Sequence, residues 1–233
     1  MAEVLVIQHA EVEPPGLIGE ILQTRGHTLR ILRPFAGEPV PESLREVAGL
    51  VLMGGPMGVY EQERYPFLRA EMRLIEEALR RDFPVLGVCL GSQLLAAVLG
   101  ARVGPGPGPE LGWHPVTLEE AATEDRLFAG LPSSFVAFHW HGDVFDLPAG
   151  ATWLARSERT LYQAFRYGHR AYGLLFHLEA TEATIRAMVR AFPEDLRRAG
   201  LDPEAMTSAS ERYLPALRDL GSQVFGRWAA LLP

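Results

Sequence analysis

The most constraining segment of this chain is residues 84–95, Pro-Val-Leu-Gly-Val-Cys-Leu-Gly-Ser-Gln-Leu-Leu, which contains the only cysteine. Its first half is a short apolar run and predicts a buried strand, whereas residues 92–99 predict a helix that ends at Gly100. Cys89 lies in the turn between them, with Gly87 and Gly91 relieving steric crowding. We expect the first helical amides to lower the pKa of the thiol and so favour nucleophilic chemistry. The alternative is a small buried hydrophobic residue.

Length and composition limit the classes of protein that this chain can be. A chain of 233 residues with 48% hydrophobic content allows one sizeable core, so we expect a single domain. No apolar run reaches the roughly 20 residues of a membrane helix, and the first residues lack a basic leader, so we expect a cytoplasmic protein without a membrane partner. One cysteine excludes an intramolecular disulfide, and the net charge of −7 argues against nucleic-acid binding.

The sequence contains no lysine and no asparagine. Without lysine, Walker-type nucleotide hydrolysis and Schiff-base chemistry are excluded, and we expect no cofactor. Without asparagine, a Cys-His pair has to be oriented by a carboxylate or by a backbone group.

Short apolar runs alternate with helical patterns in the first half of the chain. Residues 15–26 and 65–81 predict amphipathic helices, and buried strands are predicted at residues 3–8, 28–32 and 49–53. This alternation predicts an α/β fold with a doubly wound, mostly parallel sheet and flanking helices. The carboxyl ends of the strands would then bring His9, the loop at Gly54 and Cys89 to one edge of the sheet.

We expect three further segments to lie at or near this edge of the sheet. Gly54 and Gly55 follow a predicted strand; adjacent glycines can adopt positive φ and bring amides close to an oxyanion, or form an ordinary turn. Residues 104–109 alternate glycine and proline and predict a loop over the site. Glu110 follows, and we interpret it as a structural residue in preference to a partner contact.

Two histidine motifs lie further along the chain. His139, His141 and Asp143 alternate in a way that suggests a metal site, but a further ligand would have to come from elsewhere in the chain, and we favour no metal. His177 and Glu179 project to the same side of an extended segment. The carboxylate can therefore hold the imidazole in the tautomer that accepts a thiol proton, although a half-buried polar strand end would look the same.

Taken together, these motifs resemble the class I, triad-type glutamine amidotransferases. Residues 87–93 match the family's G-x-C-x-G-x-Q elbow, residues 54–56 its Gly-Gly-Pro loop, residues 141–143 its His-Gly-Asp loop, and residues 176–179 its Phe-His-x-Glu signature. The resemblance implies a flavodoxin-like fold over residues 1–181. One departure is Leu175, which stands where the family commonly has glutamine.

The resemblance also implies roles for individual residues. The catalytic triad would be Cys89, His177 and Glu179, and the oxyanion would be held by the amides of Gly55 and Leu90. The remaining residues implied in substrate binding are Gly54, Gln93, Trp140, His141 and Gly142.

The implied activity is that of a stand-alone glutaminase similar to the glutaminase domain of GMP synthetase. It would release glutamate and ammonia, and we expect the acceptor of the ammonia to be on another chain, such as a synthetase subunit. Two alternatives stay open: a γ-glutamyl peptidase or hydrolase with the same triad, and a non-catalytic binding or regulatory module. Residues 182–233 predict helices, the second from about residue 208 to 232, that pack on the same domain or form a homodimer contact.

Overall fold

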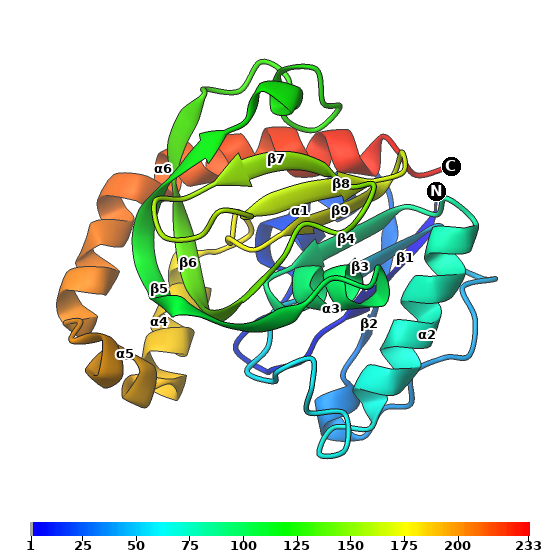
Figure 1. The fold of residues 1–233 in the computed structure, drawn as a ribbon, viewed down its shortest axis with the longest axis horizontal. Helices are drawn as coiled ribbons and strands as arrows, with labels where there is room; N and C mark the ends of the chain where they lie inside the picture. The colour runs from blue at the N-terminus through cyan, green and yellow to red at the C-terminus, as the bar shows by residue number, and fades with distance from the viewer. Residues whose placement is uncertain (1) are drawn as a thin grey trace.

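The computed structural model describes residues 2–233, which form one nine-stranded sheet covered by helices on both faces (Figure 1). Half of the sheet is parallel and has the strand order β2 (Thr28–Leu32), β1 (Glu3–Ile7), β3 (Gly49–Leu52), β4 (Val85–Val88), β9 (Ala171–Leu174). The other half continues antiparallel through β8 (Ala164–Tyr167), β7 (Thr152–Arg156), β5 (Val103–Leu118), β6 (Ser134–Phe145).

The central parallel strands β3 and β4 are apolar along their whole length because both faces of the sheet are covered there. Every residue of β3 and β4 is buried. Side chains of β1 alternate between the two cores: Val4 and Val6 pack on one face, and Leu5 and Ile7 on the other. This is the doubly wound arrangement predicted from the sequence.

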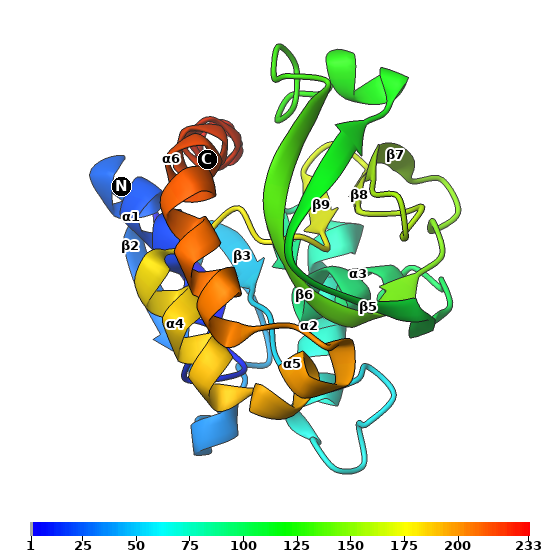
Figure 2. The same cartoon turned by 90° about the vertical axis from the view of Figure 1, so that its left-hand side faces the viewer.

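The helices divide between the two faces, as Figure 2 shows. One core contains side chains of α1 (Gly16–Thr24), α4 (Glu182–Ala191) and α6 (Pro203–Ala229). The other contains side chains of α2 (Phe67–Arg80) and α3 (Leu90–Val98). The remaining short helices are η1 (Pro34–Ala36), η2 (Glu120–Thr123), α5 (Pro193–Ala199). None of the helices within residues 2–233 is both long and apolar enough to cross a membrane.

The C-terminal segment differs from the predicted pattern. Three helices follow residue 181, and α6 begins at Pro203, five residues before the predicted start, because the Asp202 side chain caps it by accepting from the Glu204 amide at 3.0 Å. α6 packs against α1, and the Trp228 indole donates to the Val85 carbonyl of β4 at 3.3 Å. α5 was not predicted from the sequence.

Residues 104–109 are not the predicted loop, because they form the extended first part of β5. The backbone carbonyl of Arg102 faces β6, since it accepts from the Asp146 amide. Alternation along the strand therefore directs the backbone groups of Gly104 toward β6 and those of Pro105 toward the other edge. That edge is open here, because β7 pairs with β5 only at Thr117 and Leu118. Proline has no backbone N–H, so it is tolerated where no partner strand needs a donor, as at this open edge. The pairing with β6 is also irregular between Pro105 and Glu110.

The His-Trp-His-Gly-Asp segment also differs from the expectation of a loop, because residues 139–143 lie within β6. They pair with β5, with His139 opposite Gly112 and His141 opposite Glu110.

The elbow between β4 and α3 has the strained geometry that the sequence suggested. Cys89 has φ 48° and ψ −108°, a conformation that an L-residue adopts only at a cost. Neither flanking glycine has positive φ; both are needed for close packing. A Cβ on Gly87 would lie 2.5 Å from the carbonyl carbon of Gly91, and a Cβ on Gly91 would overlap the Leu52 carbonyl of β3.

We predict that Gly87→Ala lowers the free energy of unfolding by about 1–3 kcal/mol or more, because the added methyl group meets rigid backbone. Gly108→Ala is the matched control, since a Cβ there has open space around it. Urea denaturation of both variants checks this, and equal stability of the two would contradict the role given to Gly87.

Candidate active site

The Cys89 thiol is buried at the bottom of a pocket, with the residue 5% exposed. In this state the thiol donates to the main-chain oxygen of Trp140 at 3.6 Å. Burial raises the pKa of Cys89, the charges of Glu13 and Glu179 raise it further, and His177 acts in the opposite direction. The expected lowering of this pKa is therefore wrong for the unliganded site, and the thiol needs a base.

His177 and Glu179 form the candidate base. They lie just beyond β9, and Nδ1 of His177 is 2.6 Å from Oε1 of Glu179, with both side chains buried. Burial lowers the pKa of His177, but Glu179 and Cys89 together raise it by more, to well above its ordinary value. The raised pKa makes the ring a strong base: in its neutral form the proton lies on Nδ1 beside Glu179, and Nε2, which has no hydrogen bond within residues 2–233, can accept the Cys89 proton.

The Gly54-Gly55 loop follows β3 and lies beside the elbow. Neither glycine has positive φ, so that part of the prediction is wrong. Close approach requires them instead: a Cβ on Gly55 would lie 2.6 Å from Cβ of His9. Within residues 2–233 the amides of Gly55 and Leu90 donate to no other group, so both are available to an oxyanion.

A buried ion pair holds this loop from behind. His9 Nε2 lies 2.7 Å from Glu71 Oε2, and His9 Nδ1 donates to the carbonyl of Met53 at 2.9 Å. Burial lowers the pKa of His9, but Glu71 and these hydrogen bonds raise it overall, which favours the doubly protonated ring that can donate from both nitrogens. The Met53 carbonyl also accepts from the Gly91 amide, which ties the loop to α3.

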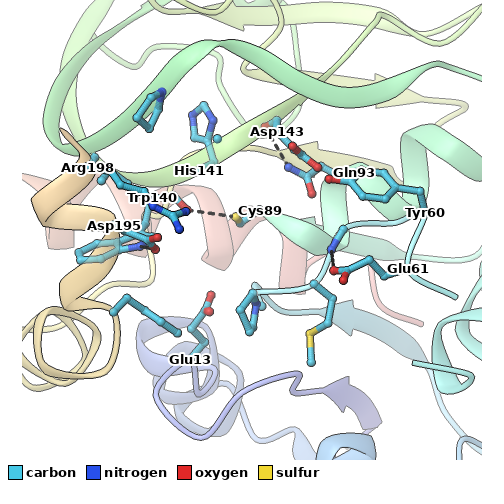
Figure 3. A pocket seen from close by; sticks show the side chains of 18 residues that line it. Glu13, Tyr60, Glu61, Cys89, Gln93, Trp140, His141, Asp143, Asp195 and Arg198 are labelled. Atoms are coloured by element: carbon cyan, nitrogen blue, oxygen red, sulfur yellow. Dashed lines mark hydrogen bonds between the residues drawn. The ribbon is translucent and has the colours of Figure 1, made fainter. Parts of the chain in front are cut away.

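The pocket above Cys89 is a cavity of about 570 Å³, shown in Figure 3. Of the residues that the sequence indicated, six line it: Gly55, Cys89, Gln93, Trp140, His141, Gly142. The other four are not part of its lining: Gly54, Leu90, His177, Glu179. Gln93 on α3 donates to the Asp143 carbonyl at 3.0 Å, so α3 and β6 are joined on one side of the nucleophile.

Glu110 lies behind the pocket and is fully engaged in hydrogen bonds. Its carboxylate accepts from Ser157 at 2.6 Å, Thr160 at 2.5 Å and Gln163 at 2.9 Å. It also lies 3.4 Å from Nε2 of His141. This agrees with the structural interpretation of Glu110.

A metal could be held by a different set of residues from the one considered in the sequence. Donor atoms of Glu110, His139 and His141 lie within 4.8 Å of one another, and Asp143 is not among them. Burial lowers the pKa of His141 to about 3, so its ring is neutral and able to ligate. The three donors that already occupy the Glu110 carboxylate compete with any ion.

Several pocket residues were not found from the sequence. Asp195 and Arg198 come from α5, and Tyr60 and Glu61 from the loop after β3. Glu13 comes from the loop after β1, at the strand edge where functional residues of such folds gather. A carboxylate directly after the first strand was the signal that could have identified Glu13. The residues of α5 carry no such local signal.

The Glu13 carboxylate is buried beside the catalytic candidates. Burial raises its pKa from 4.5 to about 7, His177 and His9 lower it, and Glu179 raises it. Burying the ionised Glu13 side chain lowers the free energy of unfolding at neutral pH, because the group ionises less readily in the folded chain than in the unfolded chain.

The comparisons with known proteins agree with this geometry. Residues 18–192 match the family model described as glutamine amidotransferase class-I. A glutamine amidotransferase-like protein of Salmonella typhimurium, YfeJ, is 35% identical over 196 residues, which are 83% of this chain and 82% of that protein. A glutamine-hydrolysing GMP synthase subunit of Ignicoccus hospitalis is 34% identical over 70% of this chain and 81% of its own length.

A solved structure extends the agreement to the whole fold. A glutamine amidotransferase from Thermotoga maritima superposes with a TM-score of 0.89 at 38% identity, covering 97% of both chains. Matches to full-length GMP synthases span only 25% and 26% of the lengths of those proteins.

We predict that Glu13→Gln stabilises the protein at alkaline pH. The folded-state pKa is raised, so the wild type loses stability as the pH rises from about 4.5 to about 7, by about 3 kcal/mol, and the variant does not. Urea denaturation at pH 5 and pH 8 should show the variant gaining about 2 kcal/mol relative to wild type. Glu11→Gln, an exposed neighbour in the same loop, is the control. A Glu13→Gln difference that is constant with pH would contradict the burial cost.

Proposed function

This chain belongs to the class I glutamine amidotransferase family, and we propose that it hydrolyses the side-chain amide of glutamine to glutamate and ammonia. The observation that carries the proposal is the juxtaposition of three features. A strained cysteine lies at the foot of a 570 Å³ cavity, and Nδ1 of His177 is 2.6 Å from Oε1 of Glu179. The amides of Gly55 and Leu90 have no hydrogen-bond partner within residues 2–233.

The residues divide the reaction into two steps. His177 Nε2 takes the thiol proton, and the Cys89 sulfur attacks the amide carbon, whose oxygen becomes an oxyanion held by the Gly55 and Leu90 amides. His177 then gives its proton to the leaving nitrogen, the carbon–nitrogen bond breaks, and ammonia departs from a glutamyl thioester. Water, deprotonated by His177, attacks the thioester, and the proton returns to the sulfur as glutamate leaves.

Residues on the β6 side of the pocket would hold the amino-acid end of the substrate. Gln93, Trp140, His141 and Gly142 line this side. Gly54 lies outside the lining, and its missing side chain leaves room for the Glu13 carboxylate. Because burial keeps His141 neutral, its ring can serve there as a hydrogen-bonding group without a charge.

The fate of the ammonia is a finer question. A separate chain that accepts it is our proposal, supported by the similarity to a protein named as one subunit of a GMP synthase. A cavity of about 570 Å³ favours a second candidate function, hydrolysis of a larger γ-glutamyl amide by the same triad, because sites of this size hold ligands larger than one amino acid. A homodimer and a cytoplasmic location stay proposals from the sequence.

A γ-glutamyl diazoketone tests the nucleophile directly. We expect mass spectrometry to show stoichiometric labelling of the wild type and no labelling of Cys89→Ser. Ammonia should be released from glutamine by the wild type and not by the variant. Failure of a well-folded wild type to be labelled would leave only the non-catalytic binding module.

A second prediction concerns the orientation of the base. Glu179→Gln should lower kcat by about 10²–10⁴-fold with little change in KM, because the amide cannot stabilise the imidazolium that forms during attack. Steady-state ammonia release measures this, with thermal unfolding as the check on folding. An unchanged kcat would remove Glu179 from the triad.

A further inference from the structure

We propose that Glu13 is a specificity residue on the leaving-group side of this site, and that it selects γ-glutamyl amides whose amine carries a second, positively charged group. The inference rests on the proposed function, because it concerns the substrate of the same nucleophile.

The first observation is an unpaired carboxylate inside the pocket. Glu13 is 8% exposed, it lines the cavity together with Cys89, and no hydrogen bond or ion pair within residues 2–233 satisfies its carboxylate. Figure 3 shows it pointing toward Cys89 from the side opposite β6. A buried carboxylate without a partner is costly, and a bound cation is the ligand that offsets the cost.

The second observation places this carboxylate relative to the reaction. A Cβ built on Gly54 would overlap Oε2 of Glu13 and would lie 3.3 Å from Cε1 of His177, so the carboxylate adjoins the ring that protonates the leaving nitrogen. Gln93, on the glutamyl side, lies across Cys89 from it (Figure 3). Glu13 therefore faces whatever is attached to the amide nitrogen.

The third observation is the charge and size of the cavity. Its lining contains one guanidinium, that of Arg198, and four carboxylates: Glu13, Glu61, Asp143, Asp195. Asp195 is engaged by the Trp140 indole at 3.2 Å, and Glu61 by the Gly58 amide at 2.8 Å, whereas Glu13 has no such donor within residues 2–233. At about 570 Å³ the cavity has room for an amine substituent beyond the glutamyl group.

Hydrolysis of glutamine itself gives Glu13 no role. Ammonia leaves glutamine as a neutral molecule and needs no carboxylate to depart. An amine with a distal ammonium group pairs with Glu13 both before and during cleavage, and a charge-assisted hydrogen bond in a dry pocket is stronger than a neutral one. The carbon–nitrogen bond breaks as in glutamine hydrolysis, with the proton from His177 going to the leaving nitrogen.

A matched set of substrates tests the proposal. Two glutamine derivatives that carry a 2-aminoethyl or a propyl group on the side-chain amide nitrogen have nearly the same shape and differ in one positive charge. In γ-glutamylglycine the group on that nitrogen carries a negative charge instead. We expect the wild type at pH 8 to have a kcat/KM about 10- to 100-fold higher for the aminoethyl amide than for the propyl amide, with γ-glutamylglycine poorest. In Glu13→Gln the ratio of the first two should fall to within about threefold.

Asp195→Asn is the control for the general charge of the cavity, since it removes another lining carboxylate and leaves Glu13 in place. Its ratio should stay close to that of the wild type. A wild-type ratio near one, a ratio unaffected by Glu13→Gln, or a ratio abolished by Asp195→Asn alone would overturn the proposal. If no amide is cleaved and the diazoketone does not label Cys89, the proposed function itself has failed; cleavage of glutamine with no charge preference refutes only the role of Glu13.

Discussion

The strained backbone at Cys89 is the constraint on which the rest of the site depends. A residue with φ 48° and ψ −108° turns the chain from β4 directly into α3, so the sulfur stands at the carboxyl edge of the parallel strands, next to free amides. The turn exists only because Gly87 and Gly91 allow strand and helix to touch, and because buried strands on both sides hold it.

Two buried histidine–glutamate pairs surround this turn and perform different tasks. The pair of His177 and Glu179 faces the thiol and supplies a base, whereas the pair of His9 and Glu71 lies behind the glycine loop and fixes its carbonyls. Glu13 lies near both histidines without bonding to either. Glu13 is therefore a buried carboxylate that belongs to neither pair, and we attribute it to recognition of the substrate.

Much of this could be predicted from the sequence, because the signals were local. The apolar runs of the parallel strands reflect burial, and the glycines around Cys89 reflect close backbone packing, so both are visible in short stretches of sequence. The fold and family that they indicated are confirmed. Errors arose where distant contacts decide. Residues 104–109 became the extended start of a strand because β6 pairs with Gly104 and Pro105 and again from Glu110 onward. The pKa of the thiol rose because the pocket buries it, and Asp195 and Arg198 of α5 reach the pocket through tertiary packing. Glu13 had only its place after the first strand as a signal, and its burial and lack of a partner come from tertiary packing.

The alternating prolines at the start of β5 have a consequence for the protein in a crowded solution. This stretch ends at Pro109, on the rim of the cavity, and its outer edge is open. An open edge normally offers amide groups to any passing strand, and so it can start intermolecular β-pairing. Because three of its six residues, Pro105, Pro107 and Pro109, have no N–H group, this edge has few donors to present. The entrance to the site can therefore stay extended and uncovered without becoming a point of aggregation.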